Sequence, residues 1–302
     1  MGNRRPLLLI VVAVVMQAFV QGVMTESVNT SGSVVFSTLA FATAAAVFGL
    51  IDRLRVSDRA PVSREVRLSM IWMNVATAVT FLSFYVSISL IPASTTSSIE
   101  SAVGPAALIV IALAVLRRRE WRGNFELLLV AAMMVIGMLL AGRTWQVSDP
   151  SVGSAETVAG LLLAATAGIG MAVVVLLSKN LGRKRISPVW VTAHRFHLTY
   201  VAAGMTLLFS GARMPDAVEV AMLFVFGILA VVIPLFLLQV GVQRAEPLPA
   251  IATIALLPGL TWLTQLAAGQ SPDIASLILI LAVVTASVAF TARSAARVRA
   301  TS

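Results

Sequence analysis

The sequence predicts an all-α polytopic membrane protein with ten transmembrane helices, arranged as two inverted repeats of five helices. Three observations predict this class. Of the 302 residues, 59% are hydrophobic and only 12% are charged, and the mean hydropathy of +0.95 lies outside the range of soluble domains. Long apolar stretches recur along the whole chain, and the basic residues lie in short runs between them. The chain contains no cysteine, which excludes disulfides and thiolate metal sites.

Each predicted helix is a mainly apolar stretch close to the length of about 20 residues that crosses the hydrocarbon core. Arg4 and Arg5 precede the first stretch as in a signal peptide, but no small-residue cleavage site follows, so we interpret it as the first helix. The fifth and ninth stretches are short or interrupted, which leaves nine spans as the alternative count. In order, the predicted spans are Pro6–Val23, Ser33–Ile51, Leu68–Leu90, Ala93–Leu116, Leu127–Ala141, Val158–Ser178, Pro188–Ser210, Val220–Gln243, Pro247–Ala267 and Ile274–Ala292.

The loops between these spans predict the orientation. With a cytoplasmic N-terminus, all 22 basic residues lie in inner segments except Arg143 and Arg213, which lie outside, and Arg195, which lies within a span. An excess of Lys and Arg on the cytoplasmic side is the rule for membrane proteins. The pattern predicts a multi-pass protein of the cytoplasmic (inner) cell membrane with both termini cytoplasmic. It also explains the net charge of +9, so we expect no nucleic-acid partner.

Two stretches 153 residues apart, 83–105 and 236–258, share an architecture. Each contains the end of a span, a very short turn with proline, a second span with small residues, and a proline midway. Five predicted spans lie in residues 1–146 and five in residues 147–302, and together they form one membrane domain. Because five is odd, the two halves have opposite orientations in the membrane. Inverted repeats with broken helices are typical of secondary transporters, which bind substrate near the midplane between the repeats.

Four motifs carry a resemblance to a known family: ASTTSSIESAVGP at 93–105, RRREW at 117–121, SPVWVTAHRF at 187–196 and QRAEPLPAIATIALLPG at 243–259. With these motifs and their spacing, nearly the whole chain resembles the EamA-type transporters of the drug/metabolite transporter (DMT) superfamily, which contain two inverted five-helix repeats. The chain departs from the family pattern in two places. The first half has no arginine at the position of Arg195, and Thr253 stands in the second half at the position matching Glu100.

The resemblance implies a secondary active exporter that moves a small polar or amphipathic metabolite, amino-acid-like or anionic, by alternating access. The chain contains no phosphate-binding loop of the G-x-x-x-x-G-K type and no hydrolase motif, so we expect gradient-driven transport, no cofactor and no enzymatic activity. A lipid or lipid-linked sugar flippase, a membrane enzyme and a structural membrane subunit remain alternatives. The expected partners are a small-molecule substrate and the bilayer, with the protein a monomer or a homodimer.

Glu100 is the first candidate site residue, because a carboxylate deep within an apolar span is costly and usually faces a cavity or a partner. It lies seven residues, about 10 Å, from the outer end of its span. Ser97, Ser101 and Gly104 share its face of the helix, and Pro105 is expected to interrupt the helix one turn further on. Glu100 either lines the transport path, where it would carry a coupled proton, or forms a structural ion pair or hydrogen bond between helices.

The second candidate cluster is His194, Arg195 and His197 in the seventh span. The two histidines share one face, and Arg195 projects about 100° away, about 10 Å from the cytoplasmic end. Arg195 either binds an anionic group of the substrate or forms a structural bridge to a carbonyl or to Glu100. We expect no metal site at the histidines, because neither a carboxylate nor a cysteine stands nearby at ligand spacing.

The remaining candidates are weaker. Gln17, Asn74 and Gln239 lie within spans, where each either lines the substrate path or forms a hydrogen bond between helices. Pro234 and Pro258 are expected to kink their helices, as are Gly104 and Pro105, and to open the backbone toward substrate.

Overall fold

The structure, a computed structural model, describes residues 4–27, 30–55, 63–114, 124–147, 154–209, 216–244, 253–270 and 273–301, and all of its regular secondary structure there is helical. The last residues of the predicted fourth and seventh spans and the first six of the ninth lie outside these ranges. The helices are α1 (Arg4–Ser27), α2 (Thr30–Arg55), α3 (Arg64–Ser87), α4 (Ala93–Ala114), α5 (Asn124–Val147), α6 (Ser154–Arg183), α7 (Pro188–His194), α8 (His197–Phe209), α9 (Ala217–Gly227), η2 (Ile228–Val232), α10 (Ile233–Arg244), α12 (Leu257–Ala267) and α13 (Ile274–Thr301).

The predicted class, a helical membrane protein, is confirmed. Within the described residues, six helical stretches are long and apolar enough to cross a bilayer on their own, namely α1, α2, α3, α5, α6 and the continuous run α9–η2–α10. Large apolar side chains cover the outside of the bundle, among them Leu208, Phe209 and Val218, which are 78–82% exposed. Such an apolar exterior is unfavourable in water but suits lipid.

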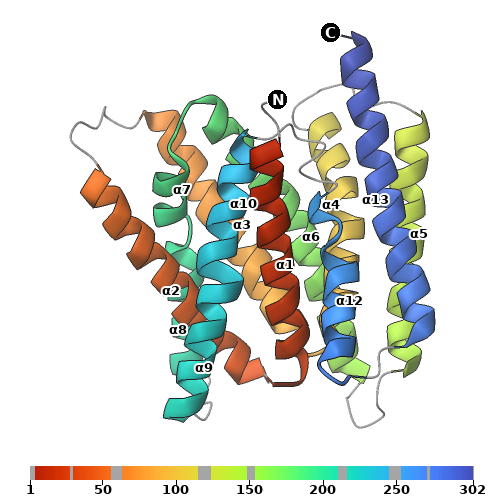
Figure 1. The fold of residues 1–302 in the computed structure, drawn as a ribbon, viewed down its shortest axis with the longest axis horizontal. Helices are drawn as coiled ribbons and strands as arrows, with labels where there is room; N and C mark the ends of the chain where they lie inside the picture. The colour runs from red at the N-terminus through yellow and green to blue at the C-terminus, as the bar shows by residue number, and fades with distance from the viewer. Residues whose placement is uncertain are drawn as a thin grey trace.

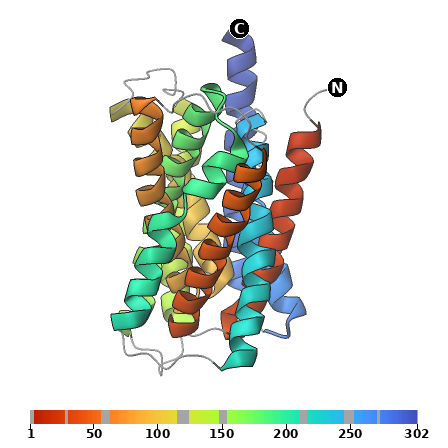
Figure 2. The same cartoon turned by 90° about the vertical axis from the view of Figure 1, so that its left-hand side faces the viewer.

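The helices form one bundle in which the two ends of the chain lie at the same end (Figures 1 and 2). Helix α1 runs away from this end and α13 runs back to it. We call it the terminal end, and the opposite one the far end. Helix α1 packs against α10 and α12, whereas α6 packs against α3 and α4; α2 packs against α8, and α5 against α13.

An aromatic core holds α2, α3 and the junction of α7 and α8 together. The rings of Phe41 and Phe81 lie 5.2 Å apart, and those of Phe41 and Phe196 lie 5.1 Å apart. Phe36 meets Tyr85 edge-on at 4.7 Å. Because such ring pairs favour particular relative orientations, this packing positions the chain at Phe196, next to Arg195.

The seventh and eighth predicted spans are not uninterrupted α-helices in the structure. The seventh predicted span divides into α7 and α8, and the break falls at Arg195 and Phe196. The run α9–η2–α10 contains the π-helical turn η2 directly before α10, where the amide of Ile233 donates to the carbonyl of Ile228. Pro234 lies one residue later. The wider turn fits the proline, which has no N–H for the carbonyl four residues earlier.

The other two prolines behave differently from each other. Helix α4 continues through Pro105 to Ala114 as one helix. The expected interruption is therefore wrong as a break in the helix. Pro105 has no N–H, so it deprives the carbonyl of Ser101 of its amide partner within a continuous α4. Pro258 lies in the first turn of α12, where its missing N–H costs nothing, after a turn at Ala255 and Leu256.

Candidate functional site

A cavity of about 140 Å³ lies inside the bundle. At about 10–15 Å³ for each water, this volume holds roughly ten water molecules. Helices α1, α3, α4, α6, α10, α12 and α13 form its walls, together with Arg195 at the α7–α8 break. Most of the lining is apolar. The polar side chains that line it are Gln17, Gln21, Glu100, Ser101, Ser178, Arg195, Gln239 and Ser287.

The cavity extends from Glu100 toward the terminal end. Val242, two residues before the end of α10, and Leu257, the first residue of α12, line it there. In the other direction it stops, because Ser97 and Ser98 in the turn before Glu100 are fully buried and do not line it. The cavity therefore comes closer to the terminal end than to the far end, where Gln21 and Phe81 line it six residues before the ends of α1 and α3.

Glu100 lies at the inner limit of the cavity and is only 9% exposed. Its carboxylate forms no hydrogen bond and no ion pair with any residue that the structure describes. The backbone of Glu100 packs closely on Gly168 of α6, where a Cβ would lie 2.8 Å from the carbonyl oxygen of Glu100. Only glycine permits this approach of α6, which brings α4 and the carboxylate into the bundle.

Arg195 is 4% exposed and lies at the break between α7 and α8. Its Nη1 donates a hydrogen bond of 2.8 Å to Oε1 of Gln239, which also accepts a hydrogen bond of 3.3 Å from Ser178. The guanidinium carbon lies 5.1 Å from the ring centre of Phe196 and 6.0 Å from that of Phe81, within the range of cation–π attraction. The Nε of Arg195 and the Nε2 of Gln239 are buried and have no hydrogen-bond partner among the described residues.

Glu100 and Arg195 line the same cavity but form no ion pair with each other. The structural bridge from Arg195 to Glu100 is therefore absent. The bridge to a carbonyl is present, and the carbonyl is that of the Gln239 side chain. The cavity thus contains two buried groups of opposite charge with unused hydrogen-bonding capacity. A polar group of either sign gains more from such a site than from apolar surroundings.

Asn74 of α3 does not line the cavity but holds the break beside Arg195. Its Nδ2 donates to the carbonyl of His194 at 2.7 Å, and its Oδ1 accepts from the amide of Leu198 at 3.3 Å. In an unbroken helix that amide and that carbonyl would bond to each other. The side chain of Asn74 therefore replaces one backbone hydrogen bond of the helix, which is the helix-to-helix alternative predicted for it.

His194 and His197 lie outside the cavity, on the outer side of α7 and α8. They are neighbours, as their spacing predicts, with ring centres 5.8 Å apart. His194 stacks on Trp190 and contacts its carbonyl at 2.9 Å, and the exposed His197 contacts the hydroxyl of Tyr200 at 3.1 Å. No group of three or more potential metal ligands occurs among the described residues.

The structure brings Gln17, Glu100, Gly104, Pro105, Arg195 and Gln239 to the cavity wall, whereas Asn74, His194, His197, Pro234 and Pro258 lie away from it. Two residues at Arg195 were not predicted from the sequence: Phe81, which lies under the guanidinium, and Ser178, which donates to Gln239. A phenylalanine and a serine in apolar helices carry no distinguishing signal. Ser178 is 61 residues from Gln239 in the chain, so only folding places them together.

No protein-family model matches the chain, and no curated protein matches its sequence. Its fold is similar to those of 13 chains of solved structures. One of these, a protein known from a crystal structure, superposes with a TM-score of 0.65 over 96% of each chain, at 15% sequence identity. At this identity the similarity shows a shared fold over the full length and nothing about activity.

Proposed function

We propose that this protein is a secondary transporter of the EamA type, in the drug/metabolite transporter superfamily, which exports a small amphipathic metabolite from the cell by alternating access. One observation carries the proposal: a cavity within a helical membrane bundle contains Glu100 and Arg195 without pairing them with each other. Buried charges in a membrane protein that do not pair with each other typically mark a substrate or ion pathway. The substrate class that fits is amino-acid-like or anionic, with an apolar part.

The packing of the helices supports two inverted repeats of five spans as the architecture. Exchanging the halves pairs α1 with α6, α2 with α7–α8, α3 with α9–η2–α10, α4 with α12, and α5 with α13. The packing of α1 against α10 and α12 then becomes the packing of α6 against α3 and α4, and the contacts of α2 with α8 and of α5 with α13 map onto themselves. The cavity lies between the halves, where inverted-repeat transporters bind substrate.

The ends of the helices support the predicted orientation in the cytoplasmic membrane. Helix α1 begins at the terminal end with Arg4, and three of the helices that return to that end stop at basic residues: α2 at Arg55, α6 at Arg183 and α10 at Arg244. A cytoplasmic terminal end satisfies the positive-inside rule. In this orientation the cavity extends toward the cytoplasm.

The test is a ligand screen on purified protein, with the thermal unfolding temperature as the readout. The panel contains amino acids and small organic anions of increasing apolar size. We expect at least one compound to raise the unfolding temperature of the parent and to lose this effect in Arg195→Gln. The stabilising compound is then tested by counterflow in proteoliposomes, where the parent should exchange it faster than protein-free vesicles do.

Lys184→Gln is the matched control, because it also removes one positive charge. Lys184 pairs with Glu65 and does not line the cavity. It should bind and exchange the compound as the parent does. The proposal fails if stabilising compounds act equally on the parent and Arg195→Gln, or if none of them is exchanged. Phospholipid that copurifies at fixed stoichiometry, with no binding from the panel, would instead favour the flippase.

A further inference from the structure

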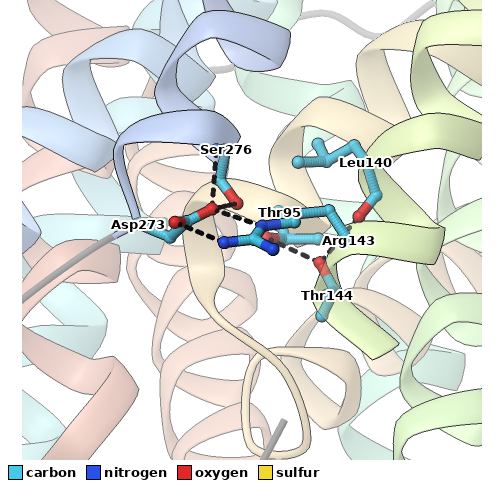
Figure 3. A network of polar contacts seen from close by, with 6 residues as sticks. All are labelled: Thr95, Leu140, Arg143, Thr144, Asp273 and Ser276. Atoms are coloured by element: carbon cyan, nitrogen blue, oxygen red, sulfur yellow. Dashed lines mark hydrogen bonds and ion pairs between the residues drawn. The ribbon is translucent and has the colours of Figure 1, made fainter. Parts of the chain in front are cut away.

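An ion pair joins α5 to the start of α13 at the far end of the bundle (Figure 3). Arg143 donates from Nε and Nη2 to the two oxygens of Asp273, each at 2.9 Å. Asp273 Oδ2 also accepts from the backbone amide and the hydroxyl of Ser276, at 2.9 and 3.0 Å. The fork of the guanidinium thus matches the carboxylate in both bonds, the strongest geometry for such a pair.

The residue after Arg143 connects the same place to α4. The hydroxyl of Thr144 lies 3.5 Å from that of Thr95, in the first turn of α4 (Figure 3). Thr95 belongs to the run Ala93–Ser98, all of it at most 3% exposed, which separates the far end from Glu100 and the cavity. Three helices therefore meet where the bundle is closed, and the ion pair lies at the outer rim of this closure.

The charges of this pair are unusual for their place. Arg143 lies on the side predicted to be external, where basic residues are scarce, so topology does not explain it. Its hydrogen bonds to Asp273, supported by those from Ser276, lower the pKa of the Asp273 carboxyl well below its ordinary value. The carboxylate is therefore charged at any physiological pH, and the two side chains remain attracted to each other.

We propose that Arg143 and Asp273 are the outer gate of the transport cycle. Their ion pair holds α5, α13 and α4 together while the cavity communicates with the terminal end only, and it separates when the cavity opens to the far end. The need to open rests on the proposed transport function. The closure itself is a property of the structure and is testable without a substrate.

The test measures access to the cavity from outside. Because the chain contains no cysteine, Ser101→Cys introduces a single thiol into the cavity wall. Its rate of reaction with a membrane-impermeant maleimide is measured on intact cells, and on inverted membrane vesicles to show that the thiol is reactive. Arg143→Gln and Asp273→Asn are each combined with the reporter. Both should raise the rate from outside about fivefold or more, the factor for losing about 1 kcal/mol of closure.

Two further variants complete the test. The exchanged pair, Arg143→Asp with Asp273→Arg, should return the outside rate toward that of the reporter alone. Lys184→Gln, which breaks the 2.8 Å pair with Glu65 between α6 and α3, should leave the outside rate unchanged. Each variant is first shown to elute as a single species in detergent.

The gate is refuted if both single neutralisations leave the outside rate unchanged, or if Lys184→Gln raises it equally. If the double variant with exchanged charges misfolds, the gate can still be tested, because the two single variants and the Lys184→Gln control are sufficient. Unchanged labelling together with a successful ligand screen would reject the gate and leave the transporter standing. Increased labelling without any ligand would support the gate and count against the proposed function.

Discussion

Replacing Asn74 by alanine should destabilise the break that places Arg195 in the cavity. The side-chain Nδ2 of Asn74 donates to the carbonyl of His194, and its Oδ1 accepts from the backbone amide of Leu198. These two backbone groups lie on the two sides of the break. Alanine removes both bonds and leaves the carbonyl of His194 and the amide of Leu198 without this partner. The chain can recover one bond by reclosing the helix, but this would rotate Arg195 away from Gln239.

The expected loss follows from the number of bonds. A hydrogen bond within a protein contributes about 0.5–1.5 kcal/mol, so two bonds predict a loss of about 1–3 kcal/mol in the free energy of unfolding. Bonds between membrane helices average about 0.6 kcal/mol, which favours the lower half of this range. Denaturant unfolding of the purified protein in detergent measures the difference between variant and parent.

Thr77→Val is the matched control on the same helix, three residues away. The hydroxyl of Thr77 is buried and has no hydrogen-bond partner in the part of the chain that the structure describes. Exchanging it for a methyl group keeps the shape and removes an unsatisfied polar group, so this variant should be as stable as the parent or more so. An Asn74→Ala variant as stable as the parent, or an equal loss in Thr77→Val, would contradict the role given to Asn74.

Three further predictions concern separate parts of the molecule. Gly168→Ala should lower the free energy of unfolding by about 1–3 kcal/mol, because the new Cβ meets the carbonyl oxygen of Glu100 at 2.8 Å. Gly49→Ala is the control and should cause no loss in the same assay, because its new Cβ has no described atom within 4 Å. Gln239→Glu should keep the protein stable by pairing with the buried guanidinium, yet abolish thermal stabilisation by any anionic ligand of the parent. The gate should be insensitive to external pH between about 5 and 8, because the pKa of Asp273 is depressed below the ordinary value of about 3.9. Its contribution is present above that value and is lost only as the pH falls through the depressed pKa. A labelling rate of Ser101→Cys that rises between pH 8 and 5 would contradict this.

Composition and hydropathy along the chain are enough to predict the class of the protein and roughly where its helices lie. Composition and long apolar stretches predicted a helical membrane protein, and the helices of the structure overlap the predicted spans where both are described, most of them extending several residues beyond. The sequence also singled out Glu100 and Arg195, because a charge within an apolar stretch is visible without any knowledge of the fold. These properties are local: transfer of about 20 residues into lipid depends on their own side chains and not on their neighbours.

Which of these side chains meet depends on how the helices pack against one another. The tertiary structure paired Arg195 with Gln239 and not with Glu100, placed Asn74 in the break of the neighbouring helix, and left His194 and His197 outside the cavity. It also joined Arg143 to Asp273 across 130 residues. Each of these contacts depends on how a helix is rotated about its axis and tilted against its neighbours. That rotation is set by packing, such as the approach of Gly168 to Glu100, and hydropathy along the chain does not encode it.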